Sequence, residues 1–210
     1  MVVQAQGLGR SAAGAAIGFV VAGGRSLRMG RDKALLEWEG STLLDHAVDR
    51  LAAVCASVRI LSGGERRYED RGLPVDTDAI PDAGPLGGIY TGLLGVGEGT
   101  GLFLGVDVPF ATVELLRRLL ELSKGHDAVV PLSSRGPEPL CAVYRSTCLE
   151  PIRRRLAAGE RKVTSFWPDA DVLQAGAEEA GNGLQVQAPP RGHVDIIVGG
   201  QRRDPPRALS

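Results

Sequence analysis

Short apolar runs alternate with amphipathic stretches along most of this chain. Ile17–Ala22 is apolar apart from one glycine, which predicts a buried strand. From Leu43 to about Val54, apolar residues recur every three or four positions and predict a helix that Ser41 caps. The predicted buried stripe of this helix contains Leu43, Leu44, Ala47, Val48, Leu51 and Val54.

The same two patterns continue toward the C-terminus. Further strands are predicted at Val58–Leu61, Leu73–Val75, Leu102–Val106, Asp127–Leu132 and Leu140–Tyr144, and further helices from Thr112 to about Leu122 and near Cys148–Ala158. Strands that alternate with helices favour a mostly parallel sheet with helices on both faces. We therefore expect an α/β fold of Rossmann-like, three-layer α/β/α type.

The predicted domain covers residues 17–174. Residues 1–16 are expected to form a disordered leader. From about Gln174 the chain mixes Gly, Ala, Glu, Pro and Arg, so residues 175–210 are expected to form an atypical, poorly ordered tail.

Composition narrows the function classes. The 210 residues suit one domain, and the net charge of −1 argues against nucleic-acid binding. No run of about eighteen apolar residues is present, so no membrane partner is expected. Three cysteines without metal-site spacing indicate a reducing cytoplasm, and three scattered histidines disfavour a histidine metal site.

Candidate chemistry begins where the first strand ends, at Gly23-Gly24. Four cations follow within nine residues (Arg25, Arg28, Arg31 and Lys33), opposed only by Asp32. Glycines let backbone N–H groups approach a ligand, and fixed cations attract an anion, so this loop is suited to a polyphosphate. Neither a Walker A motif nor a dinucleotide fingerprint matches its spacing. A solvated basic loop is the alternative interpretation.

Two further segments carry candidate chemistry. Asp107 follows the apolar run Leu102–Val106, where a carboxylate can hold Mg²⁺ against nucleotide phosphates. An N-cap or turn aspartate is the alternative. In Gly84–Gly88, Pro85 stiffens the chain, and Gly87 and Gly88 leave room for a flat ring. Taken alone, this second loop could be an ordinary turn before a helix.

The first loop reads Ala22-Gly23-Gly24-x-Ser-x-Arg28-Met-Gly-x-Asp32-Lys33, followed by Ala-Leu-Leu. It resembles the signature loop of the nucleotide-diphospho-sugar transferase-like nucleotidyltransferases, and the molybdenum cofactor guanylyltransferases in particular. The resemblance implies transfer of GMP from Mg-GTP to the terminal phosphate of molybdopterin, with release of pyrophosphate. It implies Mg²⁺ as cofactor, GTP and molybdopterin as substrates, and chaperones of molybdoenzymes as protein partners.

The same resemblance implies roles for individual residues. Lys33, Asp107 and Arg28 are the implied catalytic residues, and Asp107 is the implied metal ligand. The implied nucleotide-binding residues are Val21, Ala22, Gly23, Gly24, Lys33, Ser62, Asp78, Gly84, Pro85, Leu86, Gly87, Gly88 and Asp107. Asp76 competes with Asp78 for the same role, and Ser62 could equally be a turn serine.

The resemblance covers about Gly18 to Trp167, including a Gly159–Val163 turn of family type. It ends before the family's Asn-x-Asn-Thr-Pro segment, because Asn182 is the chain's single asparagine. Three alternatives therefore stay open. They are a related transferase that uses CTP or a sugar 1-phosphate, a non-catalytic nucleotide-binding partner of molybdoenzyme maturation, and a disabled remnant.

Overall fold

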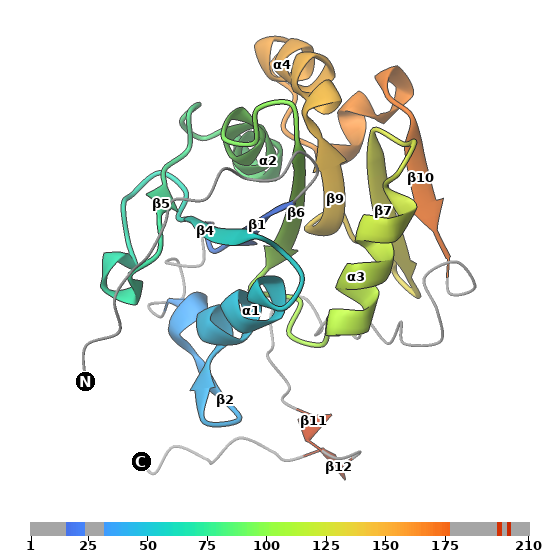
Figure 1. Cartoon of the computed structure of the whole chain (residues 1–210). Coiled ribbons are helices and arrows are strands. Elements are labelled where there is room, and N and C mark those ends of the chain that lie inside the picture. Colours follow the sequence, from blue (N-terminus) through green and yellow to red (C-terminus); the bar gives the residue numbers. More distant parts are fainter. Residues whose placement is uncertain (1–15, 24–31, 177–196, 199–200, 203–210) are drawn as a thin grey trace.

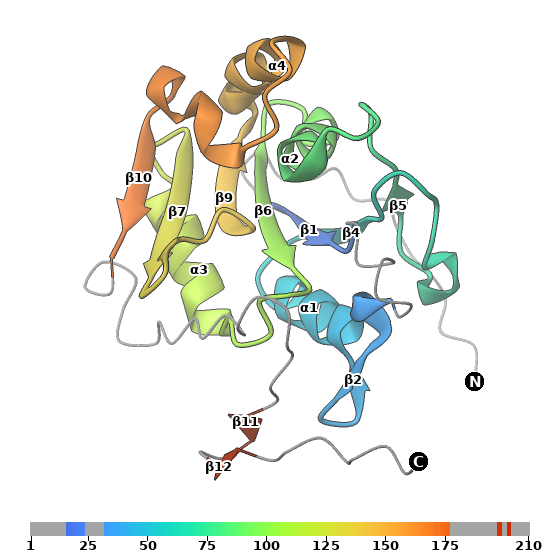
Figure 2. The same cartoon turned by 180° about the vertical axis from the view of Figure 1, so that it is seen from behind.

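The computed structural model describes residues 16–23, 32–176, 197–198 and 201–202. Its centre is a sheet with the strand order β10-β7-β9-β6-β1-β4-β5, and β8 pairs with β7 (Figures 1 and 2). The strands are β1 (Ile17–Val21), β4 (Ser57–Leu61), β5 (Val75–Asp76), β6 (Thr100–Gly105), β7 (Ala128–Ser133), β8 (Gly136–Pro137), β9 (Cys141–Arg145) and β10 (Val172–Ala175). Two small hairpins lie outside the sheet: β2 (Glu37–Trp38) with β3 (Ser41–Thr42), and β11 (Ile197–Val198) with β12 (Gln201–Arg202).

The sheet is mostly parallel. Strand β1 pairs in parallel with both β4 and β6, so that Val21 lies opposite Leu61 on one side and Gly105 on the other. Strand β9 runs antiparallel to β6 and β7, which makes the sheet mixed. The carboxyl ends of β1, β4 and β6 therefore meet at one edge, where ligands bind in open α/β sheets.

Helices cover both faces of the sheet, as predicted. Helices α1 (Leu43–Ala52) and α3 (Val113–Leu122) lie on one face, and α2 (Gly84–Leu94) and α4 (Leu149–Ala157) lie on the other (Figures 1 and 2). Val20 of β1 packs into the core with α1 and α3, whereas Phe19 packs into the core with α2 and α4. Because both faces are buried, the strand is apolar at successive positions rather than alternately.

Several element boundaries differ from the sequence expectations. Thr42, not Ser41, caps α1: its side chain accepts a hydrogen bond from the Asp45 N–H, and Asp45 reaches back to the Thr42 N–H. Helix α1 ends at Ala52, so Val54 lies beyond it, and both Val48 and Val54 are half-buried rather than buried. Thr42 at the N-cap and Asp45 at N3 form a capping box, and the hydrophobic pattern alone could not choose between the adjacent hydroxyls of Ser41 and Thr42.

Other differences concern the second loop and the last strand. The Gly84–Gly88 segment is not a loop but the first turns of α2, so that prediction was wrong. Strand β10 was not predicted, and its last residue, Ala175, is fully buried beside β7. Ala16, assigned to the leader, is also buried. The remaining leader residues and nearly all of the predicted tail, with Asn182, fall outside the described residues.

Within the described ranges, no helix is both long and apolar enough to cross a membrane. All three cysteines are free thiols: Cys141 and Cys148 are buried, and Cys55 is half-buried.

Candidate functional site

A cavity of about 870 Å³ lies at the carboxyl ends of β1 and β4. We call it the strand-end cavity. Its walls come from the end of β1, the segment after β4, the segment leading into α2, and single residues before β9 and after α4. It is lined by Val21, Gly23, Leu61, Ser62, Gly63, Gly64, Glu65, Arg67, Asp78, Asp82, Gly84, Pro85, Gly88, Leu140 and Arg161.

The first wall is held by backbone hydrogen bonds between neighbouring strand ends. The N–H groups of Ala22 and Gly23 both donate to the Leu61 carbonyl at 3.0 Å. The Val106 N–H donates to the Val21 carbonyl at 3.3 Å. These bonds fix where the chain leaves β1, and so fix where the predicted phosphate loop begins.

The second wall joins the segment after β4 to the N-terminal end of α2. Ser62 is fully buried and its N–H donates to the Asp76 carbonyl at 3.0 Å, while the Asp78 N–H donates to the Gly63 carbonyl at 2.8 Å. Gly84 and Pro85, the first residues of α2, line the cavity. The N-terminal end of α2, where the helix dipole is positive, therefore forms part of the cavity wall.

The structure separates the two candidate aspartates after β5. The Asp76 carboxylate accepts two hydrogen bonds from the Arg59 guanidinium, at 2.7 and 2.6 Å, and does not line the cavity. Asp78 does line it, and burial raises the pKa of the Asp78 carboxyl above its ordinary value. Among the described residues no ion pair to Asp78 is found, so a ligand that donates hydrogen bonds would stabilise its half-buried charge.

Asp107 lies beside the cavity rather than in its lining. It is exposed, and its Oδ1 lies 2.5 Å from the position that a Cβ on Gly105 would occupy. Leu140, which packs against that same position at 3.4 Å, does line the cavity. Asp107 is not a helix cap, because Thr112 accepts the capping hydrogen bond of α3.

The metal prediction can be tested against this donor set. Among the described residues no group of three or more His, Cys, Asp or Glu side chains converges on one point. Mg²⁺ does not require such a group, since it keeps several waters and binds through one or two carboxylates plus substrate phosphates. The single exposed carboxylate of Asp107 fits that mode of binding.

Other predicted residues lie near the cavity or outside the described ranges. Gly24 and Arg28 belong to residues 24–31, which the structure does not describe. Lys33 begins a short 3-10 turn, Lys33–Leu35, and is not among the lining residues. The N-cap of that turn, Asp32, contacts the cavity-lining Arg67. Buried predicted residues that do not line the cavity are Ala22, Leu86 and Gly87.

The cavity also contains charged residues that the sequence reasoning missed. Arg67 and Arg161 are its cations, and Glu65, Asp82 and the predicted Asp78 are its carboxylates. A signal for Arg67 was present: Gly63-Gly64 followed by Arg66-Arg67 repeats the glycine-then-cation composition found after the first strand. Arg161 lies in the Gly159–Val163 turn of family type, but the sequence did not show that long-range packing brings it beside Gly84.

Comparisons with known proteins show the family of this chain. Residues 18–172 match the model of the MobA-like NTP transferase domain. A protein of Pelotomaculum thermopropionicum, named probable molybdenum cofactor guanylyltransferase, is 39% identical over 153 residues, which are 73% of this chain and 75% of that protein.

Solved structures share the fold. Molybdopterin-guanine dinucleotide biosynthesis protein A from Archaeoglobus fulgidus superposes with a TM-score of 0.63 at 22% identity, over 78% of this chain and 84% of that one. A Mycobacterium tuberculosis protein in complex with manganese gives 0.57 at 18% identity, over 79% and 89%. Because the family model matches residues 18–172 and the Pelotomaculum relative is 39% identical, this chain is a nucleotidyltransferase and belongs to the MobA-like NTP transferase family.

Proposed function

We propose that this enzyme transfers GMP from GTP to the terminal phosphate of molybdopterin, as molybdenum cofactor, and releases pyrophosphate. One observation carries the proposal: the ends of β1 and β4 and the start of α2 enclose a single cavity that many of the predicted nucleotide-binding residues line. The name carried by the Pelotomaculum relative supports the choice of guanine nucleotide and acceptor.

The base is assigned to the part of the cavity around Asp78 and Gly88. Guanine carries two adjacent hydrogen-bond donors, the ring N1–H and the 2-amino group. A carboxylate that accepts both gains charge-assisted hydrogen bonds and relieves its own burial. Gly88 has no side chain, and a Cβ placed there would meet nothing within 4 Å, so its wall can lie flat against a ring.

The phosphates are assigned to the end of β1. The Gly23 N–H already donates to the Leu61 carbonyl, so the backbone donor would be Gly24. Arg28 and Lys33 would supply positive charge. Asp107 would hold Mg²⁺, which when bound neutralises charge on the phosphate oxygens. The protein's contribution is then to align two polyanions and to balance their charge.

The transfer itself needs no protein nucleophile. An oxygen of the acceptor's phosphate attacks the α-phosphorus of GTP, and the bond from that phosphorus to the oxygen bridging to the β-phosphate breaks. Pyrophosphate leaves with the bonding electrons. The free thiols fit this scheme, because burial raises the pKa of both Cys141 and Cys148 to about 12 and leaves them unreactive.

Titration calorimetry with GTP, CTP, ATP and UTP, each with Mg²⁺, tests the choice of nucleotide. GTP is expected to bind most tightly, and tighter binding of CTP would overturn the guanine assignment.

The charge of Lys33 gives a second test. At an effective dielectric constant of ~20, two unit charges ~4 Å apart interact by ~4 kcal/mol. Lys33→Met is therefore expected to lower kcat/KM by ~10²–10³-fold.

Turnover of GTP and molybdopterin tests the reaction. Asp107→Ala is expected to abolish formation of the dinucleotide, whereas Glu121→Gln, which changes an exposed carboxylate of α3, should leave it unchanged. Tight GTP binding without any turnover by the wild-type enzyme would favour a non-catalytic nucleotide-binding partner instead. Chaperones of molybdoenzymes remain the expected recipients of the product.

A further inference from the structure

One carboxylate, that of Asp32, joins two segments that lie far apart in the sequence. Its Oδ1 accepts a hydrogen bond from the Ala34 N–H at 3.1 Å. Its Oδ2 accepts one from Arg67 Nη1 at 3.2 Å and one from the Tyr68 hydroxyl at 2.8 Å. The first bond is local and shapes the turn, while the other two fix the turn to the cavity wall.

The turn that Asp32 begins is held from behind as well. Ala34 is 1% exposed and packs in the core with α1. The Leu36 N–H donates to the Lys33 carbonyl at 3.2 Å, and the Leu43 N–H donates to the Leu36 carbonyl at 3.0 Å. The backbone position of Lys33 is therefore set by the core on one side and by the Asp32 carboxylate on the other.

The donors come from residues 66–72, here called the strap. Tyr68 is 7% exposed and has a φ of 69°, in the left-handed region that side chains other than glycine rarely adopt. Backbone strain of this kind persists where the surroundings hold it and is common at functional sites. At this point of the chain both Arg67 and Tyr68 donate hydrogen bonds to Asp32.

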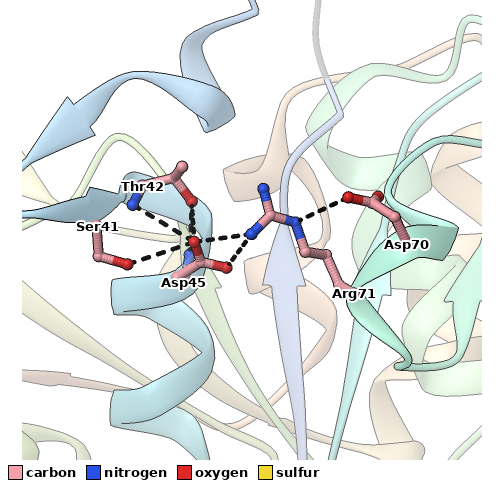
Figure 3. Close-up of polar contacts among 5 residues, drawn as sticks. All are labelled: Ser41, Thr42, Asp45, Asp70 and Arg71. Atoms are coloured by element: carbon pink, nitrogen blue, oxygen red, sulfur yellow. Dashed lines mark hydrogen bonds and ion pairs between the residues drawn. The ribbon is translucent and has the colours of Figure 1, made fainter.

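The far end of the strap is tied to α1. Figure 3 shows Arg71 reaching the Asp45 carboxylate, which also accepts hydrogen bonds from Ser41 and Thr42. The two Arg71–Asp45 distances are 2.7 and 2.9 Å. The strap is thus bound to the start of α1 through Arg71, and to Asp32 through Arg67 and Tyr68.

Arg67 also changes the charge around the turn. A carboxylate within a polyphosphate-binding segment repels the ligand and competes for a neighbouring ammonium group. The Arg67 guanidinium faces the Asp32 carboxylate, and both side chains are only about one-fifth exposed, at 22% and 21%. Water therefore screens the pair incompletely, and Arg67 offsets the negative charge.

We propose that Arg67 and Tyr68 are positioning residues for Lys33. They hold Asp32, which sets the turn from which Lys33 reaches the triphosphate, and Arg67 in addition neutralises Asp32. The inference rests on the proposed function, since it takes Lys33 as the phosphate-binding lysine. Neither residue needs to touch the ligand for this role.

A double-mutant cycle on the full chain tests the proposal. Affinity for GTP with Mg²⁺ is measured by calorimetry for the wild type, Tyr68→Phe, Arg67→Met, Lys33→Met and the two combinations with Lys33→Met. Tyr68→Phe removes only a hydroxyl and is expected to weaken binding about threefold, and Arg67→Met about tenfold or more. In the Lys33→Met background, Tyr68→Phe should change affinity less than twofold, because no lysine is left to position.

Two further variants separate positioning from general damage. Arg66→Met removes a neighbouring arginine whose partner is the exposed Glu69, and it should bind GTP as the wild type does. Arg67→Lys keeps the charge and should recover part of the lost affinity. If Arg67→Met fails to fold, Tyr68→Phe carries the test, because the buried ring is retained.

The possible results are distinguishable. If Tyr68→Phe and Arg67→Met both bind GTP with wild-type affinity while Lys33→Met binds it more weakly, this inference is overturned and the proposed function stands. Equal losses with and without Lys33 also overturn it. If the wild type prefers CTP, the guanine assignment fails and the same cycle with CTP still tests the strap. If it binds no nucleoside triphosphate, both proposals fail.

Discussion

Two adjacent glycines of α2, Gly87 and Gly88, should respond in opposite ways to the same substitution. Gly88 lines the strand-end cavity, and a Cβ built on it meets nothing within 4 Å. A Cβ on Gly87 would instead overlap the Cβ of Ala83, one helical turn earlier. The same methyl group therefore enters open space at one position and a packed contact at the other.

The expected stability changes follow from these surroundings. Alanine is favoured over glycine in a helix interior by about 0.8–1 kcal/mol, which Gly88→Ala should gain in full. Overpacking typically destabilises by about 1–3 kcal/mol, so Gly87→Ala should show a net loss of about 1 kcal/mol after the same helical gain. For a domain of this size, Gly88→Ala should raise Tm by about 2–4 °C.

Nucleotide binding should change in the opposite direction for Gly88. If a flat base lies against this residue, the added methyl group holds it away from the wall, and GTP affinity should fall at least tenfold, which is about 1.4 kcal/mol. Gly87→Ala, with its Cβ outside the cavity, should retain more of the affinity. Differential scanning calorimetry and GTP titration measure the two quantities. A Gly88→Ala variant that binds GTP like the wild type would refute the placement of the base.

Three further predictions concern titratable groups. Burial raises the pKa of the Asp78 carboxyl above its ordinary value of 3.8, so its charged form destabilises the fold at pH values above 3.8. Asp78→Asn should therefore resist urea better than the wild type at pH 7 and lose that advantage in acid. The same variant should bind GTP more weakly. Burial alone would raise the pKa of Asp45, but the hydrogen bond from Thr42 and the charge of Arg71 outweigh burial and lower that pKa. Arg71→Met should therefore lower the free energy of unfolding by about 1–2 kcal/mol at pH 7. The loss should shrink as pH falls below 3.8, where Asp45 becomes protonated. Because the pKa of the Cys141 thiol is raised to about 12 by burial and by Glu138, iodoacetamide at pH 8 should label it only after unfolding, as mass spectrometry would show.

The layers of the fold follow from the pattern of apolar and polar residues alone. The run Ile17–Val21, apolar apart from Gly18, predicted a strand buried on both faces, and such a strand requires helices on each side of the sheet. Polar residues placed just after such strands had to meet at one edge, since neighbouring parallel strands end together. Asp107 was predicted at this edge from the strand pattern, which is largely a local property, whereas Ser62 was predicted there only from the family resemblance.

Long-range contacts separate two neighbouring aspartates, of which one lines the cavity and the other does not. Asp76 and Asp78 look alike in sequence, and Arg59, which is 17 positions away from Asp76, takes Asp76 out of the cavity. Arg67 meets Asp32 across 35 positions. Such contacts depend on where separate elements come to lie once the core has packed, so no local pattern of hydrophobic and polar residues encodes them.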